Sequence, residues 1–172
     1  MKKILLFLAF IATLSINAQT DFGVSANYVN NSVVDSESGS GFNIGAFVDL
    51  SISDSFSIQP ELVYTGSTIE DLTYNLFNVN ALAKYNVSED FSLLAGPQFG
   101  FASGDVADAL DAALGDDFTS LNFQLAIGAS YNFNESIFVQ ARYAFQLNDH
   151  IKDSALGEAQ VNSLSVGLGY RF

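Results

Sequence analysis

The chain has 172 residues, a formal net charge of −13 and no cysteine, and 49% of its residues are hydrophobic. The acidic balance excludes nucleic acid as a ligand, because phosphate backbones are bound through basic side chains. The lack of cysteine excludes disulfides and thiolate metal sites, and the hydrophobic content is too high for a disordered chain.

The first residues predict a secretory signal peptide. Lys2 and Lys3 precede an apolar run from Ile4 to Leu14, and Ala18 is a small residue suited to cleavage. The run is shorter than the about 20 apolar residues that a spanning helix needs. We therefore expect residues 1–18 to be removed and residues 19–172 to form one exported domain, which keeps all 19 carboxylates.

Eight segments alternate apolar and polar residues, which is the pattern of a strand with one buried face. Most reach the 9–11 residues of a tilted membrane strand and are long for a soluble sheet. The connections alternate between long and short, as in an up-and-down barrel with both termini on the short-turn side. The expected strands cover residues 22–29, 42–53, 56–65, 77–86, 91–101, 121–133, 137–147 and 162–172.

Four of the expected connections are long and three are tight polar turns. The long ones cover residues 30–41, 66–71, 103–117 and 148–160, and the turns are at 54–55, 88–90 and 134–136. In outer-membrane barrels the long loops face outward and the short turns face the periplasm. Pro60 and Pro97 lie inside expected strands, and since proline lacks a ladder donor we expect bulges there.

The polar face distinguishes a membrane barrel from a soluble one. A soluble barrel, such as a secreted ligand-binding one, exposes many interspersed charges and turns its apolar face inward. Here the polar face consists of Ser, Asn, Gln and Gly with isolated charges, which suits a narrow lumen. The sequence thus favours an all-β, eight-stranded antiparallel up-and-down transmembrane β-barrel. The lumen charges are Asp49, Glu61, Lys84, Arg142 and Arg171.

The lumen charges predict a structural network. Isolated buried charges are costly, so Arg142 is expected to bond Glu61 and also Asp49, with Lys84 nearby. The alternative is an ion or proton path, although an eight-stranded barrel has room for side chains and little else. An inward apolar patch would instead favour a carrier of small apolar molecules. By parity that patch consists of Phe47, Val63, Leu82, Leu94 and Phe138.

The long connections carry most of the carboxylates. Such oxygens suit Ca²⁺ or Mg²⁺, yet Asp105, Asp108 and Asp111 recur at intervals of three, which predicts a short helix over residues 106–114. A solvated acidic surface is the simpler interpretation. We therefore expect no resident metal or cofactor.

His150 is the one histidine of the chain and lies near Asp149, Asp153 and Ser154. A catalytic set would need a nucleophile within hydrogen-bond reach of an oriented base. No sequence motif establishes that geometry, so we expect no catalytic residues and no enzyme activity.

Several sequence segments resemble the small outer-membrane β-barrel family that includes PorT-like proteins. They are FSIQPELVY from Phe56, FNVNALAKY from Phe77, LLAGPQFGF from Leu93, IGASYNFNESIFVQARYAF from Ile127 and LGYRF from Leu168. Asn80 departs from the pattern, since the family often has proline there. The resemblance implies an integral protein of the bacterial outer membrane without a catalytic signature.

The resemblance also implies partners. The closing strand, with Tyr170 and Phe172 on its apolar face, resembles the signal that the barrel assembly machinery recognises for insertion. Outer-membrane lipid and lipopolysaccharide would surround the barrel, and PorT-like members are linked to protein secretion. The favoured function is a non-enzymatic envelope or surface-interaction protein that assists a secretion machinery. The alternative is a carrier or narrow channel for small apolar or ionic solutes.

Overall fold

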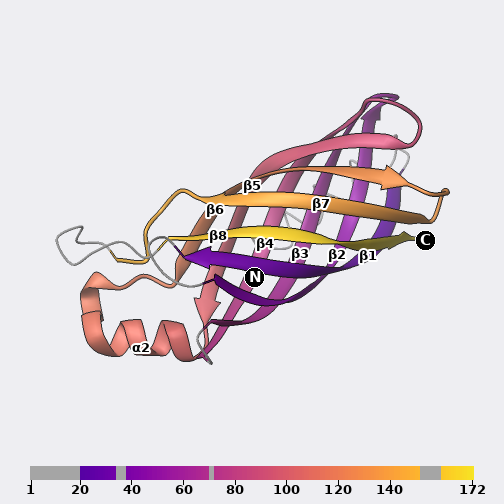
Figure 1. The fold of residues 1–172 in the computed structure, drawn as a ribbon. Helices are drawn as coiled ribbons and strands as arrows, with labels where there is room; N and C mark the ends of the chain where they lie inside the picture. Colours follow the sequence, from indigo (N-terminus) through magenta and orange to yellow (C-terminus); the bar gives the residue numbers. More distant parts are fainter. Residues whose placement is uncertain (1–19, 34–37, 70–71, 152–159) are drawn as a thin grey trace.

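The computed structural model describes residues 20–33, 38–69, 72–151 and 160–172, so the expected signal peptide lies outside the described residues. The described residues form eight strands, one α-helix and one 3-10 turn (Figure 1). They are β1 (Thr20–Val33), β2 (Ser38–Ser53), β3 (Phe56–Ile69), β4 (Leu72–Asn86), β5 (Phe91–Ser103), α2 (Asp105–Leu114), the 3-10 turn η1 (Gly115–Asp117), β6 (Leu121–Asn132), β7 (Ile137–Gln146) and β8 (Val161–Arg171).

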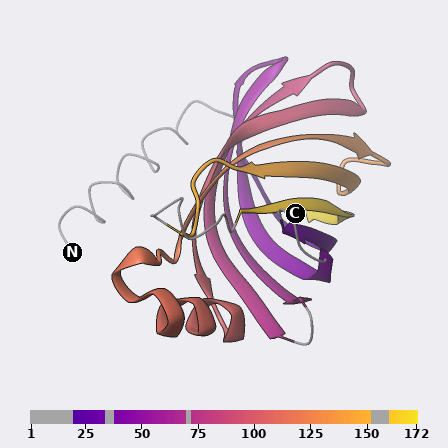
Figure 2. The same ribbon diagram turned by 60° about the vertical axis from the view of Figure 1, so that its left-hand side comes forward.

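The strands form one closed barrel in chain order. Each strand pairs antiparallel with the next, and β8 returns to β1 with Tyr170 opposite Val24. The ribbon curves round into a tilted cylinder in Figures 1 and 2. The predicted eight-stranded antiparallel up-and-down barrel is therefore confirmed. Within the described part of the chain, no helix is both long and apolar enough to cross a bilayer.

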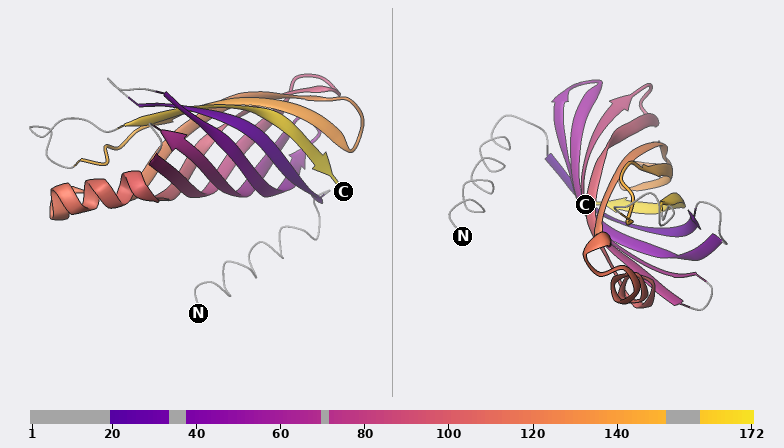
Figure 3. Two further views of the ribbon diagram at one scale, coloured as in Figure 1. Left: turned by 60° about the horizontal axis from the view of Figure 1, so that its bottom comes forward. Right: turned by 90° about the vertical axis from the view of Figure 1, so that its left-hand side faces the viewer.

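The two ends of the barrel differ. The turn end carries the tight turns β2–β3, β4–β5 and β6–β7 together with the carboxy-terminus, and the loop end carries α2. Figure 3 shows α2 projecting at the end opposite the carboxy-terminus. These two names are used below.

The apolar side chains lie on the outside of the barrel. Phe42 is 69% exposed and Leu168 is 57% exposed, whereas inward neighbours such as Asn27 and Gln140 are buried. This is the reverse of a soluble barrel, so the alternative of a secreted ligand-binding barrel is wrong. An apolar outer band with a polar interior is the arrangement that a lipid environment requires.

The strands at the loop end are longer than the alternation predicted. Ser32 pairs with Ser38 and Thr68 pairs with Thr73, so most of the two expected connections 30–41 and 66–71 is strand. Hydrophobic alternation ends where the chain leaves the apolar band, but backbone pairing continues with polar side chains. Those two expectations were wrong for this reason.

The prolines do not mark bulges. The register shift in this region lies between Ser51 and Ser53 of β2. Pro60 has no pairing partner on β2 and Pro97 has none on β4, although the register resumes unchanged beyond each gap. The missing backbone N–H of each proline thus interrupts the pairing with one neighbouring strand and does not insert an extra residue.

The predicted short helix is confirmed as α2. Ala107 and Val106 pack into an apolar cluster at the loop end. The amino-terminus of α2 is fixed to β4, because Asp105 Oδ2 accepts hydrogen bonds from the backbone nitrogen and hydroxyl of Thr73. We call this apolar cluster at the loop end the roof cluster. Its other members are Tyr74, Leu76, Ala102, Phe118 and Val161.

Candidate functional site

The lumen contains one bidentate ion pair that links opposite walls. Arg142 of β7 donates from Nη1 to Glu61 Oε2 at 2.6 Å and from Nη2 to Glu61 Oε1 at 2.7 Å. Both side chains point inward by strand parity and both are buried. Two parallel charge-assisted hydrogen bonds hold such a pair more firmly than a single contact.

Neutral amides complete the shell around this pair. Gln59 Nε2 donates to Glu61 Oε1 at 2.6 Å, and Asn80 Nδ2 donates to Glu61 Oε2 at 3.0 Å. Arg142 Nη2 also donates to Gln140 Oε1 at 2.7 Å. Sequence reasoning named the two charges and missed these amides, although their inward parity could have found them. The Glu61 carboxylate accepts four hydrogen bonds from these side chains. We therefore interpret it as a structural group, because its oxygens are already occupied by these donors.

A second ion pair lies nearer the turn end. Lys84 Nζ is 2.5 Å from Asp49 Oδ2, and both side chains are buried. The expected bond from Arg142 to Asp49 is replaced by this one. On β4, Lys84 lies four residues closer to the turn end than Asn80 does. It therefore binds Asp49 at a level of the lumen that is nearer the turn end than the level of the Arg142–Glu61 pair.

Arg171 points inward at the turn end, apart from the two ion pairs. Its guanidinium carbon lies 5.3 Å from the centre of the Phe138 ring, a cation–π contact. Its Nη1 donates to the backbone oxygen of Glu135 at 3.2 Å. Arg171 therefore closes the rim and takes no part in the network around Glu61.

Apolar side chains fill the lumen beside the ion pairs. The rings of Phe47 and Phe138 meet edge to face with centroids 5.7 Å apart. Leu82 and Leu94 belong to a buried cluster with Ala126 and Ala144. The patch that sequence parity assigned to a carrier therefore consists of packed core residues. All five members, Phe47, Val63, Leu82, Leu94 and Phe138, are buried.

His150 fastens the last loop to the roof cluster. Its Nδ1 lies 2.7 Å from the carbonyl oxygen of Thr119, and its Nε2 lies 3.3 Å from the hydroxyl of Tyr74. The Thr119 carbonyl can only accept, so Nδ1 carries the proton and Nε2 accepts from Tyr74. Burial lowers the pKa of His150, against the opposing effects of Thr119 and Asp149. Sequence reasoning missed Tyr74 because residues 72–76 were assigned to neither the expected loop nor the expected strand.

Two of the three residues considered beside His150, and half of the acidic loop residues, fall outside the described residues. Asp153 and Ser154 are among them. Of the described carboxylates, Asp105 has its pKa lowered by the two hydrogen bonds from Thr73. In the described ranges, no three histidines and carboxylates gather closely enough to hold a metal ion.

The chain resembles known proteins in one family and in several solved structures. The model of the outer membrane protein beta-barrel domain matches residues 4–172. Ail, the attachment invasion locus protein of Yersinia pestis, is 15% identical with a TM-score of 0.55, and the alignment covers 91% of this chain and 100% of Ail. No curated protein sequence matches the chain.

Two further structures are similar. Neisserial surface protein A is 17% identical with a TM-score of 0.60, covering 91% of this chain and 99% of that one. The outer membrane enzyme PagL is 18% identical with a TM-score of 0.58, covering 87% and 98%. Identities this low show a common fold, and this fold serves proteins with and without enzyme activity.

Proposed function

Because this chain belongs to the outer membrane protein beta-barrel family, we propose that it is a sealed, non-enzymatic barrel of the bacterial outer membrane. Its loop end faces outward and its turn end faces the periplasm, as the alternation of long and short connections favours. Its role is structural or adhesive and is exercised through the acidic loop end. In such a sealed barrel, neither a carrier nor a channel would have an open lumen through which a solute could pass.

The observation that carries this proposal is the plugged lumen. Arg142 and Glu61 bridge β7 and β3, and Leu82 and Leu94 fill the neighbouring level. At the loop end the roof cluster, against which α2 packs, fills the barrel. Removing either charge alone would leave its partner buried and unpaired, which is costly. The pair is therefore a permanent plug in this proposal.

The non-enzymatic part of the proposal rests on His150. It is 2% exposed, and both ring nitrogens face groups that fix the loop, the Thr119 carbonyl and the Tyr74 hydroxyl. A general base needs a free nitrogen directed at a substrate proton. PagL shares the fold, and a shared fold does not by itself imply a shared activity.

The partners follow from the outer surface. We propose that the apolar band contacts outer-membrane lipid and lipopolysaccharide. We also propose that the barrel assembly machinery binds the exposed Tyr170 of β8 and the exposed Phe172 that follows it. The exposed aspartates of α2, Asp108 and Asp111, offer an acidic platform for a basic surface of a secretion component, as the PorT-like resemblance implies.

Conductance in planar bilayers tests the seal. We expect the wild-type protein to give no steady open-pore current, while Glu61→Ser/Arg142→Ser, which empties the plug without leaving a single charge, raises conductance. The matched control is Ser92→Ala, an inward substitution outside the plug. A steady current through the wild-type barrel would refute a sealed lumen and restore the channel alternative.

A further inference from the structure

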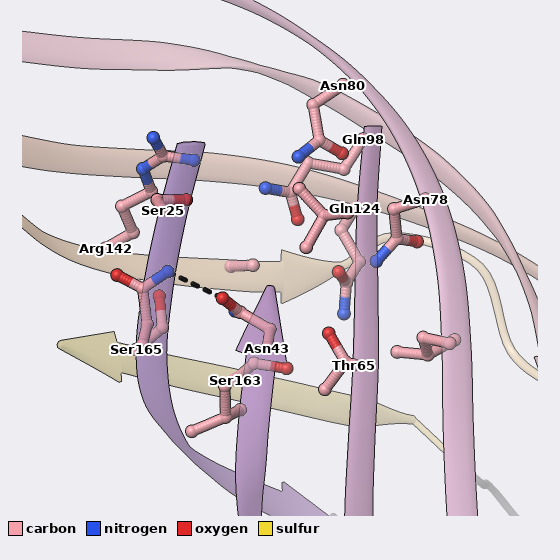
Figure 4. A pocket seen from close by; sticks show the side chains of 15 residues that line it. Ser25, Asn43, Thr65, Asn78, Asn80, Gln98, Gln124, Arg142, Ser163 and Ser165 are labelled. Atoms are coloured by element: carbon pink, nitrogen blue, oxygen red, sulfur yellow. Dashed lines mark hydrogen bonds between the residues drawn. The ribbon is translucent and has the colours of Figure 1, made fainter. Parts of the chain in front are cut away.

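The mouth of the lumen at the turn end forms a cavity of about 380 Å³, which we call the vestibule. It is bordered by the β2–β3 and β4–β5 turns, and its lining is polar apart from Val87. Sites for small ligands measure about 300–1,000 Å³, so the vestibule is large enough for one. The cavity drawn in Figure 4 lies further along the lumen toward the loop end and measures about 40 Å³, which is too small for an organic solute.

Carboxylates outnumber cations in the vestibule. Four carboxylates and two cationic side chains line it, which leaves an excess of two negative charges. A cleft lined mainly by one sign of charge attracts ligands of the opposite sign. The vestibule therefore favours a cation over an anion. Its charged residues are Asp21, Asp49, Asp54, Glu89, Lys84 and Arg171.

Two of these carboxylates face each other across the β1–β2 pair. Asp21 lies directly opposite Asp49 in the register, and both side chains line the vestibule. Directly opposed residues of antiparallel strands have Cβ atoms about 5 Å apart, and like charges at that spacing repel each other. A cation bound between the two carboxylates would relieve this repulsion.

The chain's own lysine neutralises only part of this pair. Lys84 Nζ binds Asp49 through Oδ2, whereas Asp49 Oδ1 is buried and has no hydrogen-bond partner among the described residues. Asp49 is 4% exposed, and a buried carboxylate oxygen of this kind needs a donor. Within the described ranges, Asp21 has no ion pair of its own.

Arg171 is bound on the β6–β7 side of the vestibule. Its Nη1 donates to the carbonyl oxygen of Glu135 at 3.2 Å, and its Nη2 donates to Asn132 Oδ1 at 3.5 Å. Its Nε has no partner in the described part of the chain. One such donor does not make an anion site where four carboxylates line the same cavity.

An organic diammonium ion fits this arrangement better than a metal ion does. Ca²⁺ and Mg²⁺ need several oxygen ligands around one centre, and in the described ranges no three histidines and carboxylates gather closely enough to hold a metal ion. Each ammonium group carries three donors that can bond separate oxygens. Asp49 is buried while Asp54 and Glu89 are exposed, so the negative charge extends from the interior to the rim and matches a linear molecule with a charge at each end.

We propose that the vestibule is a binding site for a small linear diamine. One ammonium group lies between the carboxylates of Asp21 and Asp49, and the other reaches Asp54 and Glu89 at the rim. The bond between Lys84 and Asp49 is kept, because the ligand uses the second oxygen of Asp49. The vestibule lies on the turn-end side of the plug, so binding needs no open lumen. This inference goes beyond the proposed function and is independent of it.

Isothermal titration calorimetry of the folded protein in detergent micelles tests the site with 1,4-diaminobutane at constant ionic strength. We expect one diamine to bind per barrel. Butylamine has a single ammonium group and should bind at least about tenfold more weakly, because it lacks the charge-assisted hydrogen bonds at one end. Absence of saturable binding of the diamine would overturn the proposal, and so would equal affinity for the two amines.

A variant locates the site. Asp21→Asn removes one of the two opposed charges and leaves the Lys84–Asp49 pair in place, and the gel shift of the folded form checks that it folds. We expect binding of the diamine to weaken about tenfold or more, as for loss of one hydrogen bond between charged groups. Asp111→Asn on α2, which changes the net charge equally at the loop end, should bind as the wild type does.

Unchanged affinity in Asp21→Asn would contradict the site, and equal weakening in both variants would show attraction to net charge alone. A competition with CaCl₂ at matched ionic strength separates the diamine from a metal ion. We expect Ca²⁺ to leave the affinity for the diamine unchanged. Stoichiometric displacement of the diamine by Ca²⁺ would assign the vestibule to a metal ion and overturn the proposal.

Discussion

Each charge of the two buried ion pairs is neutralised by one oppositely charged side chain. Arg142 and Glu61 lie on strands that are distant in sequence, and their side chains are shielded from water. A charge left behind after loss of its partner retains the cost of desolvation without the compensating attraction. The two members of the pair should therefore affect stability much more singly than jointly.

We expect Arg142→Leu to lower the free energy of unfolding by about 3–5 kcal/mol, because Glu61 is left unpaired. Glu61→Leu/Arg142→Leu should recover most of that loss, since apolar side chains can replace a buried ion pair. Urea unfolding of the protein in lipid vesicles, followed by the gel shift of the folded form, measures both. Additive losses in the double variant would contradict the pairing.

The buried histidine predicts a dependence on pH at the loop end. Burial lowers the pKa of His150 below 6.5 in the folded state, so the unfolded loop binds a proton first. Stability at the loop end is then complete above about pH 6.5 and falls as the pH drops toward the folded pKa. The protection factor of the Thr119 amide, which is the exchange rate corrected for its intrinsic dependence on pH, should be lower at pH 5 than at pH 7.5, because this amide donates to the His150 carbonyl oxygen. His150→Gln should abolish this difference; if it persists, another group is responsible.

Strand parity predicted which side chains face the lumen, including Asp49, Glu61, Lys84 and Arg142. It could not predict their pairing, because the register between strands decides which charges share a level. The bond between Lys84 and Asp49 and the amide shell of Glu61 both follow from that register. Tyr74 escaped prediction because Tyr74 and Leu76 are apolar at inward positions, whereas the alternation used to find the strand has its apolar residues facing outward from Phe77 onward.

At the scale of the element, β1 and β8 leave room for aromatic rings. A Cβ at Gly23 would collide with the ring of Phe47, and a Cβ at Gly169 would collide with the ring of Phe138. These two glycines thus allow the edge-to-face pair to lie flat against the barrel wall. The alternation predicted the strands themselves, but the reason for glycine at these positions appears only in three dimensions.

We expect Gly169→Ala to destabilise the barrel by about 1–3 kcal/mol, since the added methyl group overpacks the lumen. Gly169→Ala/Phe138→Leu should restore stability by making space for that group. The same urea unfolding compares them, with Gly66→Ala as a control, because a Cβ at this strand position meets its nearest atom, Asn75 Oδ1, at 3.5 Å. Failure of the second substitution to rescue would show that the ring is not the obstacle.

For the molecule as a whole, the sequence predicted the barrel class, strand order and outward apolar face, because these depend on periodicity alone. Strand ends, the roof cluster beneath α2 and the filling of the lumen depend on contacts between distant residues. The barrel interior combines two ion pairs, an apolar level and a polar cavity of about 40 Å³.

The separation of the paired charges along the chain also affects how the barrel assembles. Lys84 meets Asp49 within the first four strands, whereas Glu61 must wait for Arg142 on the seventh. Long-range contacts of this kind form late and only after much chain entropy is lost. A barrel that lacks its last two strands would hold Glu61 without a cation, so incomplete cylinders are disfavoured. We therefore expect neutralisation of Glu61 by Arg142 to favour closure of the complete cylinder.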